Sequence, residues 1–231
     1  MYSPTYLELK TNLEQELDLQ DETFITPNEF LNYFNEAVDM VEAAIHTIYE
    51  DYFLVTTPLT FVSGTATYVL PTDIYAQKIR GLYYNDGSTN IYEVKRIKKL
   101  SDTNWLNLSS TNSLQYLITN DATNGLRIAF YPTPTASGAF GTIWYIRNAK
   151  RFSAAADVCD IPEFTAVIVQ YVRWKCMSKE GHPDTGSAAA ALQAMKQDMI
   201  ETLTARVPDE DNKIPMDLSF YDDFDSNGGY F

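Results

Sequence analysis

Hydrophobic residues recur at helical spacing near the start of the chain. From Tyr6 to Leu17 they step by three or four positions, which predicts a short helix. A longer stripe follows Thr26-Pro27-Asn28-Glu29, whose residue types suit a capping box with proline in the first helical position. The stripe is Phe30, Phe34, Ala37, Val41, Ile45, Ile48 and Tyr52. We therefore expect a second, amphipathic helix of about seven turns.

The pattern changes after this stripe to short runs of β-branched and aromatic residues separated by turn residues. The runs are Leu54–Thr57, Leu59–Val62, Thr65–Leu70, Lys78–Tyr84, Ile91–Arg96, Leu114–Thr119, Gly125–Tyr131 and Phe140–Arg147. Pro71-Thr72-Asp73 ends one run and can open a helical turn. These features predict a small sandwich or barrel of antiparallel strands.

Helical spacing returns toward the C-terminus. Asp160 is a suitable N-cap for a helix with Pro162 in its first turn, and Gly181-His182-Pro183 ends that helix. A last helix begins near Ser187 and ends before Pro208. The simplest packing is an α+β fold: a four-helix bundle from both chain ends, an inserted antiparallel β-sandwich or barrel module, and an extended C-terminal tail. The expected segments are 1–57, 58–157, 158–206 and 207–231.

Charge divides the chain at the same boundaries. The 231 residues include 31 acids and 17 bases, a net charge of −14. Residues 1–57 contain 12 acids and 1 base, residues 58–157 contain 6 and 10, residues 158–206 contain 6 and 5, and residues 207–231 contain 7 and 1. The acidic total argues against binding nucleic acid through a broad basic face.

Residues with catalytic or metal-binding chemistry form no convincing motif. His46 and His182 lack metal-ligand spacing, and we expect surface or capping roles for them. Cys159 and Cys176 are expected to be reduced and buried. Asp223–Gly228 matches the first half of an EF-hand loop but lacks its closing glutamate, so an acidic tail is the better interpretation. We expect no catalytic residue, cofactor, metal or membrane span.

The last residues combine acids with aromatics, which disordered tails usually avoid. Five of the last twelve residues are aromatic, and aromatics are enriched at interfaces. We expect residues 216–231 to dock on a partner, with folding back onto their own chain as the alternative. The aromatic residues are Phe220, Tyr221, Phe224, Tyr230 and Phe231.

Three groups of charged residues are candidate interaction surfaces. The first basic cluster is Lys95, Arg96, Lys98 and Lys99, the second is Arg147, Lys150 and Arg151, and the acidic face is Glu36, Asp39 and Glu42. Each basic cluster could face DNA or carboxylates, with ordinary surface residues as the alternative. The acids lie mainly off the apolar stripe of the long helix, where a solvated surface is the simpler interpretation.

Four segments carry a resemblance to a known family. They are Ser63–Pro71, Leu126–Pro134, Gly141–Tyr145 and Asp160–Phe164. The first closes a strand with Tyr-x-Leu-Pro and the second with Tyr-Pro-x-Pro. With its order of helices, β module, two helices and tail, the chain resembles the head-to-tail connector (adaptor) proteins of tailed bacteriophages over residues 5–206. This group includes tail tubular protein A.

The resemblance implies a structural virion protein. Such proteins form a ring of about twelve subunits, whose closure requires two unlike faces on each copy. The ring lies at the portal vertex between portal and tail, is assembled in the host cytoplasm, and lets DNA pass without specific binding. The implied partners are further copies, the portal protein and downstream tail proteins, with no membrane. We expect the first basic cluster to meet acids of another subunit, and the acidic face to line the channel or an interface.

Two other functions remain open at this point. A tail-associated cell-wall glycosidase would use two of the many carboxylates. A carbohydrate-binding β module would use tyrosine and tryptophan side chains on its surface. Neither is marked by a motif in this sequence.

Overall fold

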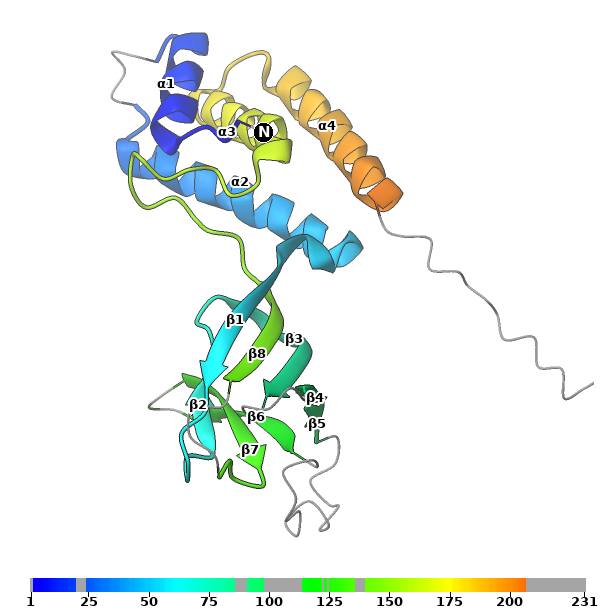
Figure 1. Cartoon of the computed structure of the whole chain (residues 1–231). Coiled ribbons are helices and arrows are strands. Elements are labelled where there is room, and N and C mark those ends of the chain that lie inside the picture. The colour runs from blue at the N-terminus through cyan, green and yellow to red at the C-terminus, as the bar shows by residue number, and fades with distance from the viewer. Residues whose placement is uncertain are drawn as a thin grey trace, which may run out of the picture.

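The computed structural model describes most of the chain and two separate hydrophobic cores. The described residues are 2–19, 24–85, 91–97, 114–121, 123, 125–135 and 140–206. One core lies among the helices of both chain ends, and the other lies inside the β module. Figure 1 shows the helical part and the β module one above the other.

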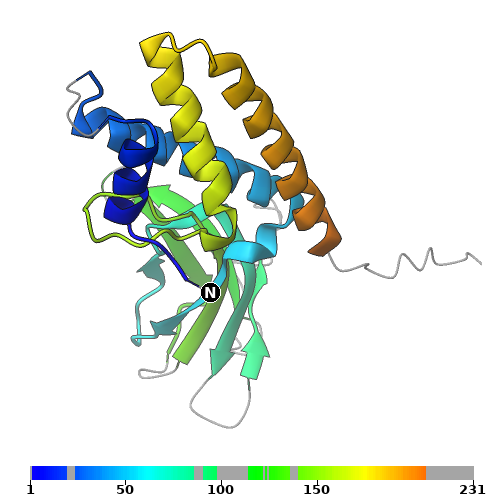
Figure 2. The ribbon, with the colours of Figure 1, turned by 90° about the horizontal axis from the view of Figure 1, so that it is seen from above.

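Four α-helices in the described residues share the first core. They are α1 (Tyr6–Glu16), α2 (Pro27–Ile48), α3 (Thr165–Glu180) and α4 (Thr185–Arg206). Leu13 of α1, Phe34 of α2 and Val172 of α3 are fully buried in it. α3 packs against both α2 and α4, which is visible from above in Figure 2. The spacing of apolar residues thus predicted each of these helices correctly.

α2 begins as its sequence predicts but ends earlier. The Thr26 hydroxyl accepts the N–H of Glu29 at 3.3 Å, and the Glu29 carboxylate accepts the N–H of Thr26 at 2.8 Å, which completes the capping box. The helix ends at Ile48, and Glu50–Phe53 form a 3-10 turn, η1. Tyr52 therefore lies outside the helix whose stripe it was expected to continue.

Eight strands in the described residues form two four-stranded sheets. They are β1 (Leu54–Thr60), β2 (Thr67–Val69), β3 (Ile74–Asn85), β4 (Ile91–Glu93), β5 (Lys95–Arg96), β6 (Gln115–Asp121), β7 (Gly125–Tyr131) and β8 (Phe140–Arg147). The first sheet has the order β1-β8-β3-β4 and the second β2-β7-β6-β5. β5 and β6 pair in parallel, so the expectation of purely antiparallel strands is wrong at this edge.

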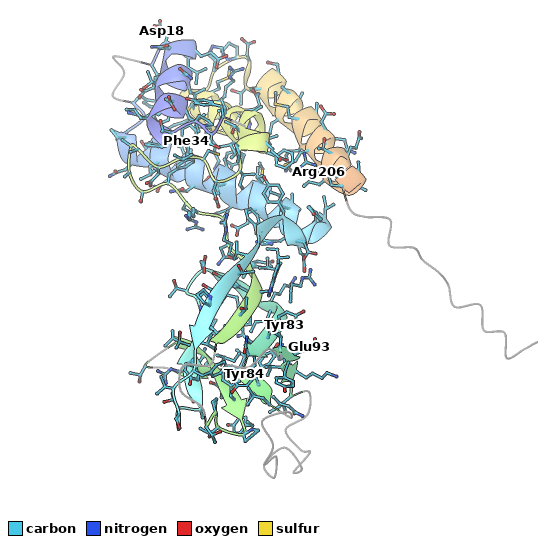
Figure 3. The ribbon with its side chains drawn as sticks, in the orientation of Figure 1. Asp18, Phe34, Tyr83, Tyr84, Glu93 and Arg206 are labelled. Carbon is cyan, nitrogen blue, oxygen red and sulfur yellow. The ribbon has the colours of Figure 1, made fainter. Side chains whose placement is uncertain are left out.

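Alternation along β3 shows how the two sheets enclose the second core. Leu82 and Tyr84 are buried, whereas Tyr83 between them is exposed (Figure 3). Phe61 lies in the middle of this core. Its ring meets Tyr84 of the first sheet and Phe130 of the second edge-on, with both pairs of ring centroids 5.0 Å apart.

One of two local expectations is wrong. The turn expected at Pro71-Thr72-Asp73 is present, since the N–H of Ile74 bonds to the Pro71 carbonyl at 3.4 Å, and β3 follows it directly. Asp160 does not cap a helix, since a 3-10 turn, η4 (Pro162–Phe164), precedes α3. The Asp160 carboxylate instead accepts hydrogen bonds from the guanidinium of Arg147 and from the backbone N–H of Lys150.

The two described connections between the helical part and the β module run side by side. η1 continues directly into β1, and β8 leads back through residues 148–161 to η4 and α3. β1 and β8 are paired from Leu54 opposite Ile146 to Thr60 opposite Phe140. The start of β1 and the end of β8 therefore lie side by side where the β module meets the helical part (Figure 1).

Gly141 offers a test of packing in the β core. A Cβ added there would lie 2.9 Å from Cε2 of the buried Phe61 ring, well inside ordinary contact distance. We expect Gly141→Ala to lower the free energy of unfolding by about 2 kcal/mol, measured by denaturant titration. Gly186→Ala is the control, because nothing lies within 4 Å of the added Cβ. Equal effects of the two substitutions would contradict the described packing.

Candidate functional site

Two of the three acids of the acidic face form ion pairs within the chain. Glu36 lies 2.9 Å from Nζ of Lys175 on α3. Asp39 accepts two hydrogen bonds from the Arg151 guanidinium, at 2.6 and 2.8 Å. The hydrogen bond from Lys175 lowers the pKa of the Glu36 carboxyl. These pairs tether α3 and the segment after β8 to α2, and they neutralise much of the charge on this surface.

The third acid, Glu42, faces the β module together with His46. Its Oε1 accepts the N–H of Ala149 at 2.9 Å and lies 3.2 Å from Nε2 of His46. His46 is only 4% exposed and stacks on Tyr75 of β3, with ring centroids 3.6 Å and planes 6° apart. Burial lowers the pKa of His46, so the ring is neutral at about pH 7. The expected surface or capping role is wrong, because β3 covers this side of α2.

An irregular stretch of β3 brings these groups together. Ala76 and Gln77 have φ angles of 45° and 59°, in the left-handed region that residues other than glycine rarely adopt. The register of β3 against β8 shifts in the same stretch, as at a β-bulge. Tyr75 before it stacks on His46, and Lys78 after it pairs with Glu50. The irregularity thus lies between Tyr75 and Lys78, two of the residues through which β3 contacts the helical part.

Further ion pairs surround the stacked rings. Arg80 binds Glu50 at 2.8 Å and Asp51 at 3.0 Å. Arg147 holds Asp160 through two hydrogen bonds of 2.5 and 3.0 Å. Burial alone would raise the pKa of Asp160, but hydrogen bonds from Arg147 and a backbone N–H outweigh it and lower that pKa. We call the following set the junction: Glu42, His46, Glu50, Asp51, Tyr75, Lys78, Arg80, Arg147 and Asp160.

The second basic cluster faces carboxylates of its own chain. Arg147 binds Asp160 and Arg151 binds Asp39, while Lys150 donates its backbone N–H to Asp160 at 2.9 Å. The carboxylate-facing interpretation is therefore confirmed for both arginines, whose charges are used inside the subunit.

The first basic cluster is described only in part. Lys95 and Arg96 form β5 at the edge of the second sheet, and both side chains are exposed. Within the part of the chain that the structure describes, neither forms an ion pair. Lys98 and Lys99 lie outside the described residues. Lys95 and Arg96 are therefore exposed cations that form no ion pair with any acid in the described residues.

The outer face of the first sheet carries large exposed side chains that sequence reasoning did not single out. Tyr83 and Trp144 are 40% and 41% exposed, and Ile91 is 67% exposed. They line an open hollow of about 640 Å³ together with Thr142. A Cβ on Gly81, which pairs with Trp144, would lie 3.0 Å from the Tyr83 ring, so the glycine lets this ring lie on the strand. Because large apolar side chains gather in one hollow, this face is a candidate interaction site.

The described residues bring together no group of His, Cys, Asp and Glu side chains suited to a metal ion. Cys159 and Cys176 are free and buried as expected, and burial raises the pKa of both thiols, that of Cys176 to about 12. His182 lies in a turn, where its Nδ1 accepts the N–H of Asp184 at 3.1 Å. Among the described helices, none has the length and apolar character needed to cross a membrane. Asp223–Gly228 and the tail aromatics lie outside the described residues.

Asp160→Asn tests the junction. The substitution removes the negative charge that faces the partly buried Arg147, and we expect it to lower the free energy of unfolding by about 2 kcal/mol at neutral pH. Asp198→Asn is the matched control, because this acid is exposed on α4 and should contribute little. Denaturant titration of both variants and the wild type measures the difference.

The same variant also tests how the contact between Asp160 and Arg147 contributes to the pH dependence of stability. Because the pKa of Asp160 is lower in the folded than in the unfolded chain, its stabilisation is present above about pH 4 and is lost as the pH falls through the folded value. Asp160→Asn should therefore lose less stability than the wild type between about pH 5 and about pH 2. Parallel losses in the two proteins would show that Asp160 does not contribute in this way.

Comparison with known proteins covers both parts of the molecule. The family model described as SU10 adaptor protein matches residues 4–214, which include all the described helices and strands. No curated protein matches the chain. The match confirms the resemblance carried by the four segments named above, and it argues against a glycosidase, since the family is structural rather than enzymatic. The chain therefore belongs to the SU10 adaptor protein family, the phage head-tail adaptors that connect portal and tail.

Proposed function

We propose that this chain is the subunit of a ring between the portal and the tail of a phage virion. The observation that carries the proposal is the adaptor-family match across both the helical part and the β module. In this proposal the four helices form a bundle that docks on the portal, and the β module faces the tail. The ring is assembled in the host cytoplasm and occupies the portal vertex.

The junction supports a role that transmits force between two partners. An adaptor must hold two docking surfaces at a constant separation, which requires a stiff connection between them. Here the stacked rings of His46 and Tyr75 and the ion pairs around them lie between the two parts, and the paired strands β1 and β8 lead from the helical part into the module. Helical part and β module can therefore act as one body with two ends.

Ring closure needs two unlike surfaces that fit each other on neighbouring copies. Lys95 and Arg96 are exposed cations on the β module, and residues 1–57 carry 12 of the 24 acids outside the tail, with a single base. The first basic cluster then meets acids of a neighbouring subunit, in a ring of about twelve copies.

The channel and the tail complete the proposal. DNA slides more easily past an acidic wall than past a basic one, because cations would hold phosphates by counterion release. Glu36 and Asp39 keep part of their surface exposed beside their ion-pair partners, so they remain candidates for this wall or for an interface. The segment with Phe220, Tyr221, Phe224, Tyr230 and Phe231 docks on a partner in the assembled neck.

Assembly with the portal tests the function directly. We expect the purified chain to be monomeric alone and to form a ring of copies when its cognate portal is added, measured by native mass spectrometry and electron microscopy. The physical reason is that a portal presents many equivalent sites and brings copies to a high local concentration. A chain that neither binds the portal nor associates in its presence would rule the proposal out.

Charge reversal tests the contact between subunits. Lys95→Glu with Arg96→Glu should weaken the ring, seen as a lower ring fraction in native mass spectra at the same protein concentration. Lys150→Glu with Lys196→Glu is the control, since both pairs of substitutions shift the net charge from −14 to −18. An equal loss of rings in both variants would indicate general repulsion, and no loss in the first would exclude this contact.

A further inference from the structure

Two neighbouring hollows on the β module combine apolar and basic surface. We call the first the aromatic face, formed by Tyr83, Ile91 and Trp144. The second hollow is lined by Arg80, Glu93, Lys95 and Arg96, among others. Tyr83 of the first hollow and Glu93 of the second are opposite each other in the β3–β4 pairing, so the hollows adjoin. Figure 3 shows Tyr83 and Glu93 next to each other on the outside of the module.

Among the residues that the structure describes, the second hollow has more unpaired bases than acids. Arg80 is already held by Glu50 and Asp51 of the junction. Lys95 and Arg96 have no acidic partner in the described stretches of the chain, and Glu93 is the acid among the lining residues. A ligand that complements both hollows must therefore offer apolar rings and negative charges on one short segment.

Residues 207–231 have this chemistry. They carry 7 acids and 1 base, and five aromatics occur among the last twelve residues. This segment follows directly on Arg206, the last residue of α4. The C-terminal end of α4 lies on the same side of the molecule as β3 and β4 in both views (Figures 1 and 2), and Figure 3 places Arg206 on the side of Tyr83 and Glu93.

We infer that, in the isolated subunit, residues 207–231 dock on the aromatic face of their own chain. Aromatic side chains of the segment cover Tyr83, Ile91 and Trp144, and its carboxylates meet Lys95 and Arg96. The contact removes apolar surface from water and neutralises charge on both partners. It concerns the subunit before assembly and does not depend on ring formation.

Tethering favours the chain's own face over that of a second copy. Residues 207–231 can span up to about 80 Å when extended, which leaves ample length to reach the module from α4. A tether of this length holds its end at an effective concentration of about 1 mM. At protein concentrations near 1 μM, roughly a thousandfold lower, a second copy competes poorly even when the contact is weak.

Photo-crosslinking in the full chain tests the inference. The probe is benzoylphenylalanine at position 91, where the native Ile91 is exposed and the core is untouched. The chain is irradiated at about 1 μM as a mixture of isotopically labelled and unlabelled protein. We expect crosslinks to residues 207–231 within single chains, mapped by mass spectrometry. The control places the probe at Val69, which is 57% exposed on the second sheet and should give no enrichment of such crosslinks.

Variants of the basic hollow test its share of the contact. Lys95→Glu with Arg96→Glu should lower the crosslinking yield from position 91 about threefold, whereas the charge-preserving Lys95→Arg with Arg96→Lys should keep it. If the probe at 91 disturbs folding, judged by thermal unfolding, Thr142 in the same hollow takes it instead. Equal yields from positions 91 and 69 overturn the inference, as do crosslinks found only between labelled and unlabelled chains, which would mean a second copy.

Discussion

The antiparallel ladder of β1 and β8 joins segments that lie far apart in the sequence, and the rest of the architecture depends on it. It forms one edge of the first sheet, and both strands are continuous with the helical part. The end of β8 brings Arg147 to Asp160, and the start of β1 follows the turn that holds Glu50 and Asp51. The hydrophobic cores stabilise each part, but this ladder decides where one part sits on the other.

The uneven distribution of charge along the sequence corresponds to ion pairs between its segments in the structure. Acids of the first segment and bases of the middle segment neutralise each other inside the subunit, as in Asp39 with Arg151 and Glu50 with Arg80. The attraction between segments therefore acts first on the folding of one chain. What remains for partners is the smaller set of exposed charges, with Lys95 and Arg96 prominent among those described. This distinction separates residues that shape the adaptor from those that can connect it to neighbours.

Periodicity and capping chemistry predicted the helices and most strands, because these signals are local. The capping box of Thr26 and Glu29, for example, predicts where α2 begins from a stretch of only four residues. The parallel pairing of β5 was not predictable, because a strand of two residues is too short to show the alternation of apolar and polar positions that marks a strand. The burial of His46 depends on β3 lying across α2, which is a contact between distant segments. The left-handed backbone at Ala76 and Gln77 was not predictable either, because neither residue is a glycine, the residue type that usually marks such a conformation. Alternation likewise places Tyr83 and Tyr84 on opposite faces, but only the packing of the second sheet decides which face is buried.

The paired entry of β1 and β8 has a mechanical consequence. A pulling force along the axis of the molecule passes from the helical part into the module through two covalent backbones, those that lead into β1 and β8. These two backbones share the force, and the hydrogen bonds between strands bear it only further along, inside the module. Side-chain contacts at the junction then carry little of a straight pull and mostly resist bending and twisting. Ionic strength and acid, which weaken those contacts, should soften the subunit against torque while leaving its tensile strength almost unchanged.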